Sequence, residues 1–168
     1  KRNNIDMRIK LSIPIVLFVA SFRVCIQKNL YTPILKNQND KDIDWTNYKY
    51  VIVGNRKGDG DAGIIWMNKI KSYESKSVIC AIATIPRWIT RTPGSKYFIK
   101  KSISLLEKNI PIFIDWEEDF SNNNDIHEYP TILIVYVDGE NIIEEGRIYG
   151  SYNKQNWIKF INLSKKYT

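Results

Sequence analysis

The sequence has few of the residues on which metal sites and most nucleophilic catalysis depend. Its 168 residues include two cysteines, Cys25 and Cys80, and one histidine, His127. Two cysteines are too few for a disulfide framework, and with one histidine they do not supply the four ligands of a structural zinc site. One histidine is enough for a Ser-His-Asp or Cys-His arrangement, but no recognisable nucleophile motif accompanies His127. We interpret it as a surface or turn residue.

The sequence also lacks a clustered excess of one charge, although its formal net charge is +7. Residues 1–36 hold 7 Lys and Arg against 1 acidic residue, which leaves 18 against 17 in residues 37–168. A nucleic-acid groove requires clustered Lys and Arg, and the strongest runs are the pairs Lys100-Lys101 and Lys165-Lys166. We therefore do not expect a nucleic-acid partner. The hydrophobic content of 43% is enough for one folded core.

Residues 1–28 predict an export signal or a short membrane anchor. Four basic residues among the first ten precede a 12-residue apolar run at residues 11–22, which is the pattern of a secretory signal. The run is shorter than the roughly 20 residues of a membrane-spanning helix, and Arg23 ends it, so a cleaved signal is favoured over an anchor. The alternative is an apolar helix packed on the domain. We expect an extracytoplasmic location, periplasmic or in the cell envelope, with residues 11–22 as the route to membrane association.

The rest of the chain predicts a linker followed by one α/β domain. Residues 29–47 are polar and irregular, which indicates a linker or N-terminal extension, and the domain is expected over residues 48–168. Apolar runs predict strands at 48–54, 78–84 and 111–115, and an Asp-Gly turn joins a hairpin at 130–137 and 142–147. Helical spacing predicts a helix at about 62–73, a second after Ser95 with apolar positions between 98 and 106, and a third after Asn153. Asp61, Ser95 and Asn153 are the expected N-caps.

This order of elements resembles the thioredoxin-like superfamily, in its TlpA-like and redoxin branch. Tyr129-Pro130-Thr131 resembles the cis-proline segment of that superfamily, Pro111 to Asp115 resembles its Pro-Val-Leu-Xaa-Asp strand, and Gly146 to Gly150 falls at its glycine-containing bend. The resemblance covers residues 48–163. It implies a three-layer sandwich with a mixed central sheet, a C-terminal antiparallel hairpin and a closing helix.

The catalytic motif of that family is missing. The family carries Cys-Xaa-Xaa-Cys where the first helix begins, because the helix N-terminus lowers the pKa of the first thiol. Aligned on Trp66, the two cysteine positions are occupied by Asp59 and Ala62, and no cysteine lies between Cys25 and Cys80. Cys80 is expected in the middle of a buried strand, where a thiol is inaccessible. We therefore expect no catalytic residue and no cofactor.

What the resemblance leaves is the groove that receives an extended peptide in the family. A protein or peptide partner is therefore expected. For Trp66 the alternative is core packing, and for Tyr129 it is a residue that only favours a cis bond before proline. The predicted groove consists of the residues that match the family's active site: Asp59, Gly60, Asp61, Ala62, Trp66, Tyr129 and Pro130.

Three functions remain open at this stage. The leading one is an exported thioredoxin-like domain without redox cysteines that acts as a binding or accessory module. The others are a thiol-disulfide oxidoreductase related to TlpA and a structural subunit of a membrane-associated assembly. The acidic residues of the predicted strand ends offer oxygen ligands for a metal, but they match no calcium loop, so we predict no metal site. These residues are Asp59, Asp61, Asp115, Glu117, Glu118 and Asp119.

Overall fold

A computed structural model describes residues 28–55, 57–74, 78–106 and 110–165. These residues form one mixed sheet in the order β1-β7-β6-β3-β4-β5-β2. Strands β3, β4 and β5 are parallel, whereas β6 is antiparallel to β3, and β7 is antiparallel to β6. The strands are β1 (Lys28–Asn29), β2 (Lys36–Asn37), β3 (Tyr50–Gly54), β4 (Ile79–Ile85), β5 (Ile112–Trp116), β6 (Thr131–Asp138) and β7 (Asn141–Tyr149).

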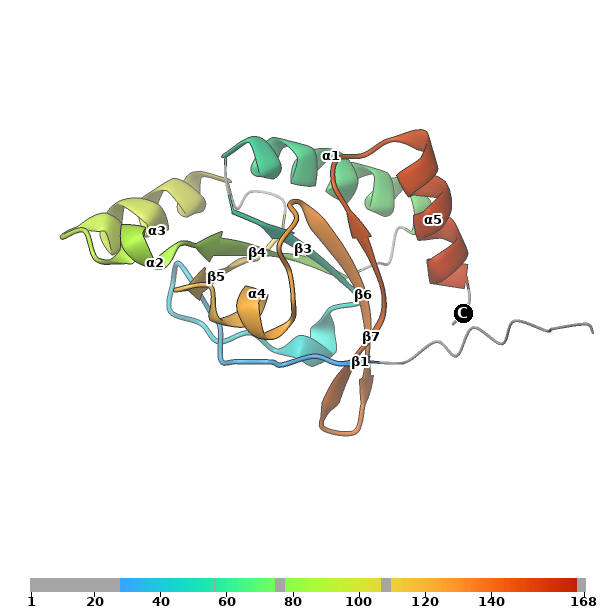
Figure 1. Cartoon of the computed structure of the whole chain (residues 1–168), viewed down its shortest axis with the longest axis horizontal. Helices are drawn as coiled ribbons and strands as arrows, with labels where there is room; N and C mark the ends of the chain where they lie inside the picture. Colours follow the sequence, from blue (N-terminus) through green and yellow to red (C-terminus); the bar gives the residue numbers. More distant parts are fainter. Residues whose placement is uncertain (1–27, 56, 75–77, 107–109, 166–168) are drawn as a thin grey trace, which may run out of the picture.

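Helices and the N-terminal segment cover the sheet on its two faces, which gives three layers (Figure 1). Helices α1 and α5 lie on one face, and α4 with the N-terminal segment lies on the other. Helices α2 and α3 lie side by side at the end of the molecule opposite α5. The helices are η1 (Trp45–Asn47, a 3-10 helix), α1 (Lys57–Tyr73), α2 (Arg87–Thr90), α3 (Ser95–Leu106), α4 (Asp119–Asn123) and α5 (Lys154–Ser164).

Alternation along the central strands divides the buried residues into two clusters. In β6, Leu133 and Val135 face one cluster, whereas Ile132 and Ile134 face the other. The first cluster packs under α4 and the N-terminal segment, and the second packs under α1 and α5. The continuous apolar strands of the sequence are therefore buried on both faces, as strands of a covered sheet are.

Residues 29–47 belong to the folded domain, and the prediction that they form a linker ahead of it is wrong. Strand β1 pairs with β7 and β2 pairs with β5, so this segment closes both edges of the sheet. Its apolar residues Leu30, Leu35 and Trp45 are buried in the first cluster. Because these residues follow neither a helical nor a strand period, the sequence pattern does not show that they enter a core.

The predicted strands and the hairpin are confirmed to within two residues. Asn153 caps α5, since its side chain accepts a hydrogen bond from the Asn156 N–H at 2.8 Å. Two short helices, α2 and α4, were not predicted, because four and five residues are too few to show a helical period. Ser95 begins α3, but its Oγ is buried without a hydrogen-bond partner among the described residues, so it is not the predicted side-chain cap.

The predicted export signal or anchor at residues 1–28 lies almost wholly outside the described residues and stays a prediction. Within the part of the chain that the structure describes, no helix combines the length and apolar character needed to cross a bilayer.

Candidate functional site

The start of α1 and the start of β6 meet at one end of the central strands of the sheet. Strands β3 and β6 are antiparallel neighbours, and Val53, one residue before the end of β3, pairs with Thr131, the first residue of β6. Gly54 and Pro130 therefore come next on the two strands, and α1 begins three residues after Gly54. The Tyr129-Pro130 peptide bond is cis. The structure thus brings together the two segments from which the sequence predicts a groove.

The first turn of α1 is held against the end of β3. The Asp59 carboxylate accepts a hydrogen bond from the Asn55 N–H at 3.2 Å, and its Cβ lies 3.3 Å from where a Cβ on Gly54 would be. A carboxylate in the first helical turn is stabilised by the helix dipole and by unpaired N–H groups. Helix α1 therefore begins at residue 57, and the prediction that Asp61 caps a helix from 62 is wrong. The glycines at 58 and 60 suggested a break that does not occur.

The exposed part of this turn is small. Gly60 and Asp61 are exposed, and Asp59 and Ala62 are half-buried. A Cβ added to Gly60 would meet no heavy atom within 4 Å. The surface at the start of α1 therefore has open space over Gly60, and the exposed Asp61 carboxylate lies next to it.

Trp66 does not line this surface, which corrects the sequence prediction. Its side chain is 0% exposed and packs in the cluster under α1 and α5. The indole N–H donates to the Gly150 carbonyl at 3.1 Å, and the ring lies 5.5 Å from Tyr152 and 5.9 Å from Phe160 between centroids. A peptide on the surface has no access to it. Seven residues after Asp59, Trp66 is on the same side of α1, about two turns further along the helix.

Tyr129 is half-buried and packs against the first cluster. Its hydroxyl donates to the Ile126 carbonyl at 3.2 Å, and burial raises the pKa of the phenol above its usual range. Pro130, by contrast, is buried. Its carbonyl accepts a hydrogen bond from the Gly150 N–H at 2.8 Å, so the cis-proline segment is tied to the end of β7. Tyr129 is thus the residue of this segment with surface left to offer.

A buried polar cluster lies at the C-terminal ends of the neighbouring strands β4 and β5 and was not predicted from the sequence. Asp115, at 0% exposure, accepts hydrogen bonds from the backbone N–H groups of Phe120 and Ser121 at 2.8 and 3.1 Å and from the Ser121 hydroxyl at 2.8 Å. Thr84, at the end of β4, lies 2.7 Å from the same hydroxyl between oxygens. Burial raises the pKa of Asp115, and the hydrogen bonds oppose that rise. Asp115 therefore holds the start of α4 and does not face solvent as a metal ligand.

The acidic residues at the strand ends do not gather. Among the described residues, no group of three or more His, Cys, Asp or Glu side chains is placed to hold a metal ion. Glu117, Asp119 and Asp61 are exposed, and Glu118 is half-buried. His127 is exposed, as expected for a turn residue.

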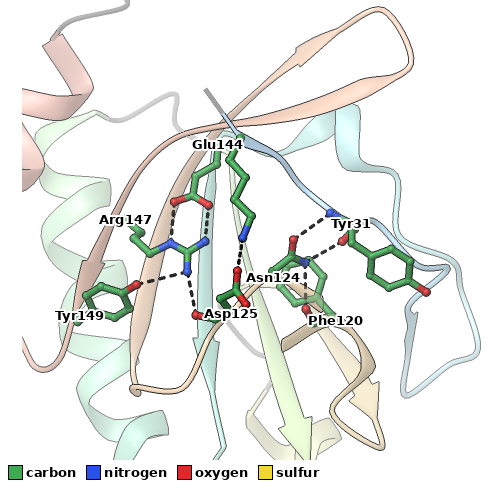
Figure 2. A network of polar contacts seen from close by, with 8 residues as sticks. Tyr31, Phe120, Asn124, Asp125, Glu144, Arg147 and Tyr149 are labelled. Atoms are coloured by element: carbon green, nitrogen blue, oxygen red, sulfur yellow. Dashed lines mark hydrogen bonds and ion pairs between the residues drawn. The ribbon is translucent and has the colours of Figure 1, made fainter. Parts of the chain in front are cut away.

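A second polar network fixes the loop that leads to the cis-proline (Figure 2). The Arg147 guanidinium donates to the Glu144 carboxylate through two nitrogens, one of them at 2.7 Å, and this pairing raises the pKa of Arg147. The same guanidinium donates to the Asp125 carbonyl at 3.1 Å and to the Tyr149 hydroxyl at 3.3 Å. The hydrogen bond from Arg147 to the Asp125 carbonyl therefore attaches the loop before Pro130 to β7, and the nearly buried ion pair with Glu144, within β7, holds the guanidinium in place.

The N-terminal segment holds the same loop from its other side. The Asn124 side chain accepts from the Tyr31 N–H at 2.9 Å and donates to the Tyr31 carbonyl at 2.8 Å, as a neighbouring strand would (Figure 2). The Lys28 ammonium lies 2.6 Å from the Asp125 carboxylate. These contacts join residues more than 90 positions apart, so no local pattern in the sequence announces them.

The described cysteine is a core residue. Cys80 is the second residue of β4 and is 0% exposed, and burial raises the pKa of its thiol far above the usual range. A thiol that is neither ionised nor accessible does not exchange disulfides. The interpretation of Cys80 as a core residue is confirmed. The described residues where α1 and β6 begin include no cysteine.

Comparison with solved structures gives the fold. The pneumococcal exposed lipoprotein thioredoxin of Streptococcus pneumoniae strain TIGR4 aligns with a TM-score of 0.53 and 15% identity, over 83% of this chain and 98% of that chain. A SCO1/SenC family lipoprotein of Bacillus anthracis aligns with a TM-score of 0.53 and 12% identity, over 85% of this chain and 97% of that chain.

The N-terminal domain of PilB from Neisseria gonorrhoeae aligns with a TM-score of 0.50 and 17% identity, over 72% of this chain and 82% of that chain. No protein-family model and no curated protein sequence matches the chain. Identities of this size establish architecture alone. The sheet order, the cis bond before Pro130 and these alignments together show that the chain has a thioredoxin-like fold.

Proposed function

We propose that this thioredoxin-like domain is a redox-inactive module that binds a protein or peptide at the surface where α1 and β6 begin. The observation that carries the proposal is the juxtaposition of the exposed turn at Gly60 and Asp61 with the cis-proline segment at Tyr129, in a site that has an acid where the family has its first cysteine. Such a site could receive an extended chain but could not carry out thiol exchange. The proposed groove consists of Asp59, Gly60, Asp61, Ala62, Tyr129 and Pro130, and it leaves out Trp66.

We further propose that the module works outside the cytoplasm, in the cell envelope. The basic N-terminal residues and the apolar run at 11–22 support this location. Two of the structurally similar proteins are described as lipoproteins, which is consistent with it. Protease accessibility of the tagged full chain tests the location in cells whose outer layers are opened while the cytoplasmic membrane stays intact. Protection of the whole chain until that membrane is lysed would contradict it.

The binding proposal is tested with variants that change the groove and leave the fold intact. Gly60→Leu adds a side chain in open space on an exposed helical position, so it blocks the groove without disturbing the core. Asn68→Leu adds the same side chain to an exposed position two turns later on α1 and serves as the matched control. Tyr129→Ala removes the half-buried ring from the other side of the groove.

Binding is measured by fluorescence anisotropy against an array of unstructured peptides. The proposal expects peptides whose affinity falls at least about tenfold in Gly60→Leu and in Tyr129→Ala, and is unchanged in Asn68→Leu. Binding that survives both groove variants, or an array without a single binder, would contradict it.

A reduction assay separates the proposal from the oxidoreductase alternative. In the presence of dithiothreitol the protein is expected to leave the rate of insulin reduction at the buffer rate, because Cys80 is buried and the helix start carries Asp59. Acceleration of insulin precipitation would favour thiol-disulfide exchange instead. The structural-subunit alternative predicts neither peptide binding nor acceleration.

A further inference from the structure

Helices α2 and α3 form a surface of one charge sign. Residues 86–106 contain five basic residues and no acidic one, although residues 37–168 as a whole are nearly neutral. The five are Arg87, Arg91, Lys96, Lys100 and Lys101. Two of them form ion pairs with acidic side chains of other elements: Arg87 with Glu117 at 3.6 Å and Lys100 with Asp40 at 2.6 Å. The remaining three leave this end of the molecule positive.

The same two helices expose large apolar side chains. Trp88 on α2 is 73% exposed, and on α3 Tyr97 and Phe98 are each 66% exposed and Leu105 is 70% exposed. Single exposed apolar residues are normal on protein surfaces, whereas a group of four on two adjoining helices is not. We call these four residues, with Arg91 and Lys101, the α2–α3 patch.

The patch on α3 follows a helical period. Tyr97, Lys101 and Leu105 are spaced four residues apart, so they lie on one face, and Phe98 stands beside Tyr97 with the ring centroids 5.7 Å apart. Ile103, by contrast, is buried, and Ile99 is half-buried. The helix is therefore amphipathic in an unusual sense, because its outward face mixes aromatic and apolar residues with an exposed lysine.

We propose that the α2–α3 patch docks on an anionic lipid surface. Aromatic rings with a polar edge favour the headgroup level of a membrane, apolar side chains such as Leu105 enter the acyl boundary, and Lys and Arg are attracted by anionic lipids. Arg91 and Lys101 are exposed, with no ion pair among the described residues, and so are available for phosphate groups. This inference does not rest on the groove proposed above.

Charge and composition favour a membrane over the two other occupants of such a surface. A second copy of the chain would place the five basic residues opposite each other without acidic partners. A nucleic acid would need a longer basic stripe, and stacking on bases does not use Leu105. An anionic membrane matches both the charge and the apolar side chains.

The test measures where vesicles protect the full chain from hydrogen exchange. Vesicles of phosphatidylcholine with 30% phosphatidylglycerol are expected to slow exchange at residues 87–106 and to leave α5 unchanged, whereas vesicles of phosphatidylcholine alone leave both unchanged. Because the readout is local, binding through residues 11–22 does not imitate it. Absence of protection at 87–106 would overturn the proposal.

Patch variants of the full chain and their matched controls complete the test with the same vesicles and the same local readout. Arg91→Gln with Lys101→Gln is expected to raise the vesicle concentration needed for half-protection of residues 87–106 roughly fivefold for each charge removed, whereas Lys154→Gln with Lys159→Gln on α5 leaves it unchanged. Trp88→Ser, Tyr97→Ser and Phe98→Ser together are expected to abolish the protection of 87–106, and Ile34→Ser, Ile65→Ser and Ile158→Ser together are not. Equal effects of patch and control variants would overturn the proposal, as would protection of 87–106 by a single-stranded oligonucleotide but not by vesicles.

Discussion

Two groups of aromatic residues on the helices of this protein have opposite surroundings. Trp66, Trp157 and Phe160 on α1 and α5 pack against one another, with centroids 5.1 to 6.2 Å apart, over the sheet. Trp88, Tyr97 and Phe98 on α2 and α3 face solvent. The first group has a second helix to pack against on the same face of the sheet. The second group lies at the end of the sheet and is exposed. An aromatic side chain is therefore buried by the elements that pack on it, and not by its residue type alone.

The largest expected effect breaks the first group. Phe160 is 0% exposed, stacks on Trp157 with an interplanar angle of 7° and packs at a tilt against Tyr50, with the centroids 5.2 Å apart. Phe160→Ala is expected to lower the free energy of unfolding by about 3 to 5 kcal/mol, because it leaves a cavity in a closed cluster. Trp88→Ala should change it by about 0.5 kcal/mol or less. Urea denaturation measures both, and similar losses in the two variants would show that the second group is also packed.

The charged residues repeat this contrast between packed and exposed groups. The side chains of Arg147 and Glu144 are 13% and 10% exposed, whereas those of Lys100 and Asp40 are 31% and 67% exposed. Arg147→Ala leaves the Glu144 carboxylate almost buried without its partner, and we expect a loss of about 2 to 4 kcal/mol in the free energy of unfolding. Lys100→Ala should have a much smaller effect, which added salt reduces further.

The double variant Arg147→Met with Glu144→Leu sharpens this second comparison. Replacing both partners removes the unpaired charge, so the double variant should lose less stability than Arg147→Ala. A double variant as unstable as the single one would mean that the hydrogen bond from Arg147 to the Asp125 carbonyl, which both variants lose, contributes more to stability than the unpaired Glu144 carboxylate costs.

The sequence predicted the parts of the fold that depend on local periodicity. The strands, the hairpin turn and the cap at Asn153 each follow from residues within a few positions of one another, and all were confirmed. Two local predictions, the N-caps at Asp61 and Ser95, were wrong, and the larger error concerns residues whose place depends on distant partners. Trp45 is buried because Phe120 stacks on it at 5.5 Å between centroids, 75 positions away, so residues 29–47 looked like a linker.

The candidate site divides in the same way. The resemblance to the thioredoxin-like superfamily correctly placed the start of α1 beside Pro130, because the pairing of β3 with β6 brings these two segments together. It did not separate the exposed Gly60 from the buried Trp66. Both positions belong to α1, and the side of α1 that is covered depends on the packing of α5, which the local sequence does not show. The contacts of Asp115 and Arg147 were missed because their partners come from other elements.

Asp115 allows a prediction with a defined pH dependence. Burial raises the pKa of this carboxyl in the folded protein, whereas the unfolded value is about 3.9. The folded state therefore binds the proton more tightly, so the stabilisation from Asp115 is fully present below about pH 4 and is lost as pH rises through the folded pKa. The advantage of the wild type over Asp115→Asn should shrink with rising pH in urea denaturation. A constant or growing advantage would show that the hydrogen bonds from Phe120 and Ser121 outweigh burial.

The smallest expected effect compares the two sides of α1 at its glycines. Gly60 has open space around its missing Cβ, whereas the Cβ of a residue at Gly63 would lie 3.2 Å from the Ile52 Cγ2. Gly60→Ala is expected to raise the free energy of unfolding by about 0.5 to 1 kcal/mol, because alanine loses less entropy in a helix. In Gly63→Ala the crowding against β3 opposes the same gain, so the variant should be no more stable than the wild type. Equal stabilisation of both would mean that α1 stands further from β3 than the contact between Gly63 and Ile52 indicates.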